Sequence, residues 1–206
     1  MINSEADARK YVADLCDADA FEKLERFVAL LTEENNRQNL VAKPTLESIW
    51  QRHIADSAQL VQFVPRETHT VLDLGSGAGL PGLVWAIVRP SDMLKLVESR
   101  RKRIGWLERV SDALELGNCE IIGARLEVVE SFPADVITAR AFAPLPQLIA
   151  LAERFSTKGT TWVLPKGRSA AQECENLPKH LKSMFHVEQS LTDDDAGILV
   201  GSMPSK

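Results

Sequence analysis

Three glycines stand directly after one apolar run of the chain and directly before another. The first run covers residues 71–74, the glycines are Gly75, Gly77 and Gly79, and the second run covers residues 83–88. A strand that breaks into a glycine-rich turn before a helix can place bare backbone N–H groups beside a ligand. The pattern therefore predicts a ligand-binding turn, and the identity of the ligand decides the function.

These glycines fit two different signatures. Beginning at Gly77 they match G-x-G-x-x-G, the dinucleotide signature, but two residues late and with Pro81 where the helix should open against a pyrophosphate. Beginning at Gly75, where the run ends, that signature requires glycine at the position of Leu80. The pattern G-x-G-x-G does fit from Gly75 and suits S-adenosylmethionine (SAM), which has no pyrophosphate. SAM is favoured, with NAD and a purely structural turn as the alternatives.

Acidic residues after the next two expected strands suit an adenosyl group. Glu98 ends a short apolar run 23 residues beyond Gly75, where a carboxylate can accept both ribose hydroxyls of either SAM or NAD. Further on, the backbone at Leu126 and the carboxylate of Glu127 are placed to meet the adenine. The alternative for this last pair is a helix start with an acidic first turn.

The loop at residues 139–145 stands where an α/β fold presents its catalytic groups. It contains no Pro-Cys nucleophile, no Asn/Asp-Pro-Pro-aromatic tetrapeptide, and no His, Asp or Glu to act as a base. Guanine N7 is a methyl acceptor that suits a loop without a general base, because it has a lone pair and no proton to remove. Arg140 stays protonated and could position the SAM carboxylate, an RNA phosphate or a base edge; the alternative is a buried ion pair. Phe142 could stack on a base or pack in the core.

The helices and strands expected from the sequence position these residues. Residues 1–62 have helical spacing. After Pro65 we expect strands at 70–74, 94–98, 119–122, 134–139, 160–164, 184–189 and 196–200, and helices at 81–88, 100–116, 145–154 and 170–181. This order predicts an α/β Rossmann-like fold of the SAM-dependent methyltransferase type, whose doubly wound seven-stranded sheet ends in an antiparallel hairpin. We expect an N-terminal helical extension (1–64) packed on a methyltransferase domain (65–206).

Charge and cysteine content narrow the class of protein. The net charge of −5 argues against a protein that coats nucleic acid nonspecifically, yet residues 89–103 hold six Lys/Arg and only two acidic residues. Three scattered cysteines suggest neither a disulfide framework nor a metal site. We expect a cytoplasmic monomer without a signal peptide or membrane span. Its candidate RNA contacts are Arg52, His53, Arg100, Arg101, Lys102, Arg103, Lys166 and Arg168.

Several motifs together resemble one family, the RsmG (GidB) methyltransferases of small-subunit rRNA. They are Asn39-Leu-Val-Ala, Arg52-His-Ile-Ala-Asp-Ser57, Leu72-Asp-Leu-Gly-Ser-Gly-Ala-Gly-Leu-Pro-Gly82, Arg140-Ala-Phe-Ala and Lys166-Gly167. The resemblance implies SAM contacts at Gly75, Leu80, Leu126, Glu127 and Arg140. It also implies methylation of guanine N7 in the 530 loop of 16S rRNA, as naked rRNA or within the small subunit.

The chain departs from the family pattern at Glu98, where aspartate is more familiar, and in its short segment after Leu199. A non-catalytic rRNA-binding or assembly factor on the same fold is the alternative function. An NAD-dependent oxidoreductase is the least favoured of the three functions, because the chain has no Tyr-x-x-x-Lys and no evident His–Asp catalytic pair.

Overall fold

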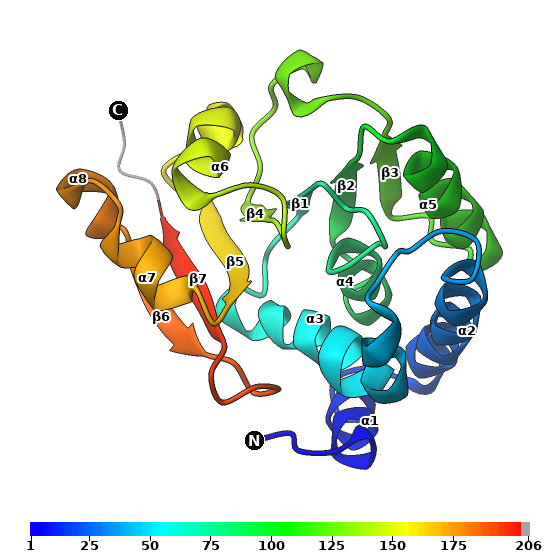
Figure 1. Cartoon of the computed structure of the whole chain (residues 1–206). Coiled ribbons are helices and arrows are strands. Elements are labelled where there is room, and N and C mark those ends of the chain that lie inside the picture. The colour runs from blue at the N-terminus through cyan, green and yellow to red at the C-terminus, as the bar shows by residue number, and fades with distance from the viewer. Residues whose placement is uncertain (203–206) are drawn as a thin grey trace.

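A seven-stranded mixed sheet with helices on both faces organises the chain, whose computed structural model describes residues 1–202 (Figure 1). The strand order is β3-β2-β1-β4-β5-β7-β6. The strands are β1 (Thr70–Leu74), β2 (Met93–Val97), β3 (Cys119–Ile122), β4 (Val136–Thr138), β5 (Thr161–Gly167), β6 (Phe185–Gln189) and β7 (Gly197–Ser202). Strands β1 to β5 pair in parallel, and β7 pairs antiparallel with both β5 and β6. The predicted doubly wound sheet with a terminal hairpin is confirmed.

Successive side chains along each strand point to opposite faces of the sheet and so pack into two separate cores, as expected for a sheet covered on both faces. Val71 and Leu94 belong to the core beneath α4 (Gly82–Val88) and α5 (Arg101–Ala113). Leu72 belongs to the core beneath α6 (Leu145–Ala152). Asp73 shares the α4 face with Val71 and is fully buried there.

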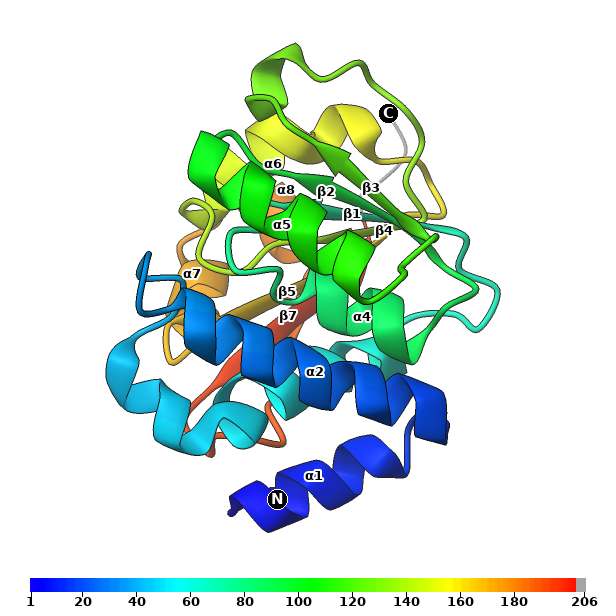
Figure 2. The same ribbon diagram turned by 90° about the vertical axis from the view of Figure 1, so that its right-hand side faces the viewer.

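The N-terminal helices extend the core on the α4 side of the sheet (Figure 2). Helices α1 (Glu5–Ala13) and α2 (Ala18–Glu34) begin at Ser4 and Asp17, whose side chains accept the N–H of Asp7 and Ala20. Leu24, Phe27 and Leu31 of α2 are fully buried in the same core as α4 and α5. The helices and sheet thus share one core, while the domain boundary at residue 64 stays a prediction.

A π-helix, Trp50–Ala55, interrupts the segment between α2 and the sheet. It follows the 3₁₀ turn Lys43–Ser48 and leads into α3 (Asp56–Ala58) and a second 3₁₀ turn, Gln59–Phe63. The carboxylate of Glu5 caps its start, accepting the N–H of Trp50 at 3.0 Å and of Gln51 at 2.8 Å. Helical spacing predicts a helix here but not its wider turn, which is rare and often found at functional sites.

Most expected elements differ from the observed ones by a few residues at their ends, and two of these differences matter most. Strand β2 ends at Val97, so Glu98 lies just beyond it. The helix expected at 170–181 is two helices, α7 (Ala170–Glu175) and α8 (Lys179–Lys182), because Pro178 precedes the second and favours an extended residue before it. Within residues 1–202, none of the helices has the length and apolar character needed to cross a bilayer.

Candidate active site

Most N–H groups of the glycine turn already donate to acceptors within the protein, so the expectation that they are bare is wrong for these groups. Those of Gly75 and Ser76 donate to the carbonyl of Val97, and those of Gly79 and Leu80 donate to the carbonyl of Ser76. The Gly77 N–H donates to the Glu98 carboxylate at 3.0 Å. A pyrophosphate needs free donors at such a turn, so this arrangement disfavours a dinucleotide.

The glycines of the turn serve two purposes. Gly75, Gly77 and Gly79 all have positive φ, at 68°, 53° and 89°, a conformation that side chains disfavour. Gly75 and Gly77 line a cavity, whereas a Cβ on Gly79 would stand 2.3 Å from Cδ1 of Leu83. Gly79 therefore allows the turn to pack against α4 and does not itself line the cavity.

Glu98, just after β2, holds the glycine turn by hydrogen bonds. Its Oε2 accepts the Gly77 N–H, and its Oε1 accepts the N–H of Ser99 at 2.7 Å and of Arg100 at 2.8 Å. An ionised carboxylate has about four acceptor positions, so one is left open. Contact with both ribose hydroxyls therefore requires the carboxylate to release a backbone N–H.

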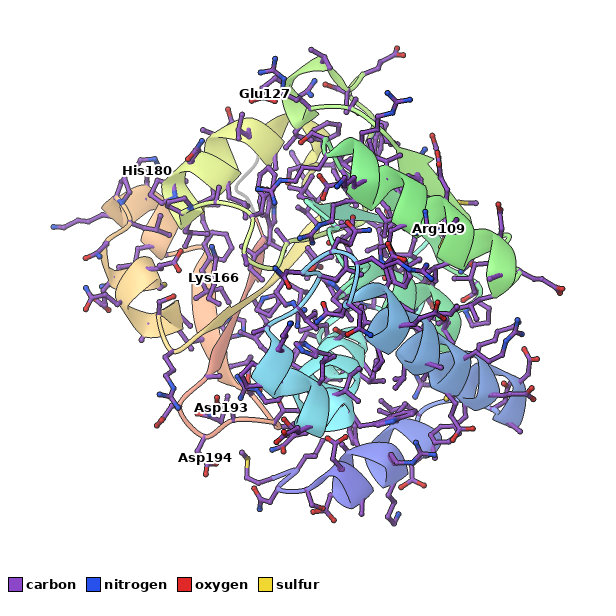
Figure 3. The ribbon with its side chains drawn as sticks, turned by 45° about the vertical axis from the view of Figure 1, so that its right-hand side comes forward. Arg109, Glu127, Lys166, His180, Asp193 and Asp194 are labelled. Carbon is purple, nitrogen blue, oxygen red and sulfur yellow. The ribbon has the colours of Figure 1, made fainter. Side chains whose placement is uncertain are left out.

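A cavity of about 320 Å³ lies over this turn, and we call it the glycine-turn cavity. Its lining includes Leu40, Gly75, Gly77, Leu80, Glu98, Arg100, Arg103 and Leu126. Leu126 begins the 3₁₀ turn η4 (Leu126–Val128) and is buried, whereas Glu127 is exposed on the same turn and is not part of the lining (Figure 3). Leu126 therefore lines the glycine-turn cavity and Glu127 does not, while the adenine contacts expected of both residues stay predictions.

A second cavity of about 1,100 Å³, which we call the wide cavity, opens beside the first. It lies between residues 45–56, the loop at residues 140–144, the end of β5 and the β6–β7 turn. Its lining includes Thr45, Arg52, His53, Asp56, Lys166, Arg168, Glu173 and Asp193. The structure thus brings together residues that lie far apart in the sequence.

Arg140, Ala141 and Phe142 line both cavities, and we call them the shared wall. Ala141 has a φ of 52°, which is unfavourable for a residue with a Cβ and is typical of strained functional sites. Lys166 donates to the carbonyl of Ala143 at 3.2 Å and so helps to hold this loop. The loop after β4 therefore separates, and connects, the two cavities.

His53 orients Arg140 from the π-helix. The Thr45 hydroxyl donates to the carbonyl of Ala42, so its oxygen accepts from His53 Nε2 at 2.7 Å. Arg140 Nη1 donates to His53 Nδ1 at 3.3 Å. His53 is therefore the neutral Nε2–H tautomer, in keeping with a pKa lowered to about 3 by burial and by Arg140 and Arg52.

Asp56, one turn after His53, lies near the same guanidinium nitrogen. Its Oδ2 is 3.7 Å from Arg140 Nη1, and its Oδ1 accepts from Gln59 Nε2 at 3.0 Å and from the Thr192 hydroxyl at 2.9 Å. Burial raises the pKa of Asp56, although Arg140 opposes this shift. Arg140 is thus half-buried beside Asp56, and it also lines both cavities.

Acidic partners already occupy three of the basic residues expected to bind RNA. Arg52 pairs with Asp193 at 2.8 Å, and Arg168 pairs with Asp195 at 3.3 Å. Both acidic residues lie on the β6–β7 turn, where Figure 3 labels Asp193. Lys166 pairs with Glu173 at 3.0 Å. Arg52 and Arg168 lie at the wide cavity with exposed side chains, whereas the Lys166 side chain is buried.

The other basic candidates lie at the start of α5. Arg100 and Arg103 line the glycine-turn cavity, and Arg103 donates to the carbonyl of Asn39 at 2.8 Å. Arg101 and Lys102 are exposed and line neither cavity. The basic run is therefore divided between the cavity rim and the open surface.

Comparison with known proteins decides the family. The family model described as rRNA small subunit methyltransferase G matches residues 20–196. The chain belongs to this family. A ribosomal RNA small subunit methyltransferase G of Erythrobacter litoralis is 57% identical over 98% of this chain and 97% of its own length. The same-named protein of Novosphingobium aromaticivorans is 49% identical over 97% and 89%.

Solved structures share the fold of this chain. An MtNAS mutant in complex with S-adenosylmethionine matches with a TM-score of 0.57 and 16% identity, covering 97% of this chain and 78% of that one. The fibrillarin/Nop5p complex matches with a TM-score of 0.57 and 17% identity, covering 75% and 82%. At such identities the likeness concerns the fold alone.

The sequence pattern indicated no role for three residues in or beside the shared wall, Thr45, Asp56 and Ala141. Asp56 stood within the quoted Arg52–Ser57 motif, where its three-residue spacing from His53 on a helix was the available signal. Thr45 and the positive φ of Ala141 had no comparable signal, because both depend on packing between distant segments.

Proposed function

We propose that the protein transfers the methyl group of SAM to N7 of a guanine in the 530 loop of 16S rRNA, in line and without a general base. The shared wall carries this proposal. A small cavity over the glycine turn and a large open cavity meet at Arg140, Ala141 and Phe142. A cofactor in the first and a base in the second would approach each other there.

The residues of the glycine-turn cavity suit SAM. Gly75 and Gly77 line the cavity without a side chain and so allow close approach of a ligand. Glu98 offers an open acceptor position for a ribose hydroxyl, and Leu126 offers an apolar surface to the adenine. The internal use of the turn's N–H groups suits a ligand without a pyrophosphate. When bound, SAM supplies a methyl carbon made electrophilic by the adjacent sulfonium.

The shared wall is built for positioning and not for proton transfer. The Arg140 guanidinium stays protonated, and both ring nitrogens of His53 already have partners. Guanine N7 has no proton to lose, so alignment of the base with the methyl group is the main contribution required of the protein. Arg140 can contact the SAM carboxylate from one cavity and the base from the other, because a guanidinium presents five N–H donors.

RNA would bind across the wide cavity and the start of α5. Arg52 and Arg168 line the wide cavity, and Arg100 to Lys102 form an exposed basic run. Phosphate contacts from such groups make affinity dependent on salt concentration. We propose a monomeric cytoplasmic enzyme that acts on 16S rRNA or on the small subunit.

Two measurements test this function. Titration calorimetry should show saturable binding of SAM, weakened strongly by Gly77→Val, and no comparable binding of NAD. Mass spectrometry of rRNA from a deletion strain should show the loss of one N7-methylguanosine, restored by the intact gene. Unchanged modification would favour a non-catalytic rRNA-binding factor.

A further inference from the structure

Three carboxylates line the wide cavity, and two of them have both oxygens occupied. Glu173 accepts from the Ser169 hydroxyl at one oxygen and from Lys166 and the Leu145 N–H at the other. Asp193 accepts from Arg52 and from the N–H of Asp195. The carboxylates of these two residues are therefore committed to holding the protein together.

Asp56 differs, because only its Oδ1 is used. Gln59 Nε2 and the Thr192 hydroxyl donate to that oxygen and fix the direction of the carboxylate. Among residues 1–202, no group donates a hydrogen bond to Oδ2, which lies 3.7 Å from Arg140 Nη1. Asp56 Oδ2 is thus an oriented and open acceptor in the wide cavity.

Arg140 places donors beside this acceptor. Its Nη1 donates to His53, while its Nη2 and Nε have no hydrogen-bond partner within the described part of the chain. Arg140 lines both cavities, whereas Asp56 lines only the wide cavity. Moving outward from the glycine-turn cavity, the wall therefore presents first a donor and then an acceptor.

Guanine has the complementary order along its edge. N7 and O6 are acceptors, and N1–H, which follows O6, is a donor. If N7 faces the glycine-turn cavity, O6 comes to Arg140 and N1–H comes to the next group outward. We propose that Asp56 Oδ2 accepts the N1–H of the target guanine and, with Arg140, selects guanine over adenine. This proposal rests on the proposed function at N7.

Adenine would present the reverse order to the same two residues. Its exocyclic amino group would bring donors against the donors of Arg140, and its N1 lone pair would face the carboxylate. Sites that bind a base by buried polar groups reject an analogue that leaves those groups unpaired. The discrimination should therefore depend on Asp56 and not on shape alone.

The test uses the full-length protein and small subunits reconstituted with rRNA that carries one defined base at the target position. With the unaltered protein, methyl transfer should occur on guanine and, within a few-fold, on inosine, which keeps N7, O6 and N1–H. Transfer should be lost on 1-methylguanine and on adenine. Equal transfer to 1-methylguanine, or none to inosine, would overturn the N1–H contact without the need for any variant.

The variant Asp56→Asn replaces the open acceptor by a donor of the same size. It should lower kcat/KM on guanine by about 10- to 150-fold, as expected for loss of a hydrogen bond to a charged group. It should also narrow the preference for guanine over adenine at least tenfold, while SAM affinity changes by less than about twofold. The matched control is Asp194→Asn, which removes the same charge from an exposed residue that does not line the cavity. An unchanged guanine-to-adenine ratio in Asp56→Asn would refute the proposal.

A 7-deazaguanine target separates this proposal from the function on which it rests. This base keeps O6 and N1–H but lacks N7, so it should bind competitively and accept no methyl group. Methylation of 7-deazaguanine would refute N7 as the acceptor. Absent methylation together with unaltered base selection in Asp56→Asn would leave the N7 function intact and remove only the role of Asp56.

Discussion

The ring of Phe142 lies directly against Gly75. A Cβ built on Gly75 would stand 2.5 Å from Cδ2 of Phe142, and Gly75 itself has a φ of 68°. The loop after β4 can therefore reach the end of β1 only because residue 75 has no side chain. Through this contact the glycine turn sets the position of the shared wall.

Gly75→Ala should impair both folding and SAM binding. The left-handed backbone conformation alone destabilises an alanine by about 1–2 kcal/mol, and the new methyl group must displace Phe142. We expect Kd for SAM to rise at least tenfold by calorimetry. Gly117→Ala is the matched control, because its Cβ meets no atom within 4 Å. Equal losses in the two variants would contradict a specific role for Gly75.

Glu98→Gln should weaken SAM binding, and Glu127→Gln should not. The NH₂ group of glutamine would face backbone N–H groups that now donate hydrogen bonds to the Glu98 carboxylate. Each hydrogen bond lost in this way should destabilise the turn by about 1–3 kcal/mol. Glu127 is exposed and outside the glycine-turn cavity, so the Kd of Glu127→Gln for SAM should stay within about twofold of the wild-type value. A comparable loss in Glu127→Gln would show that its carboxylate contacts the adenine, as the family resemblance implies.

Asp73 should make folding stability decrease with rising pH. Burial raises the pKa of this carboxyl from 3.8 to about 6, so the folded state favours its protonated form. Its stabilising effect is complete below pH 3.8 and is lost as the pH rises through 6, a change of about 3 kcal/mol. Relative to wild type, Asp73→Asn should gain about that amount between pH 4 and pH 7 in urea unfolding. A pH-independent difference would contradict the burial of an ionisable Asp73.

His53 should act in the opposite direction. Burial and the nearby Arg140 and Arg52 lower its pKa from 6.5 to about 3, so its stabilising effect is present above pH 6.5. It is lost by about 1.4 kcal/mol per pH unit as the pH falls from 6.5 towards 3. His53→Asn, which keeps an acceptor for Arg140, should remove this slope. The exposed His180→Asn should retain it; if both variants keep the slope, His53 is not its source.

Local patterns predicted most of the fold. The runs expected at 70–74 and 119–122 match β1 and β3 residue for residue. Residues 71–74 of β1 are all buried, and such a strand shows directly as an apolar run. Pattern reasoning failed where a single residue or a wider turn decided the outcome. Pro178 divides the expected helix at 170–181, and the π-helix at Trp50–Ala55 shares its periodicity too closely with an α-helix to be distinguished.

Sequence by itself determined the glycine turn, the order of strands and helices and the family motifs, because these depend on backbone conformation and on neighbours along the chain. Only the tertiary structure decided which groups meet at the shared wall. Arg140 contacts His53 across 87 residues of sequence, and its side chain reaches that position from a loop that contains the left-handed Ala141. Such contacts depend on how the N-terminal helices pack on the sheet, which no local pattern records.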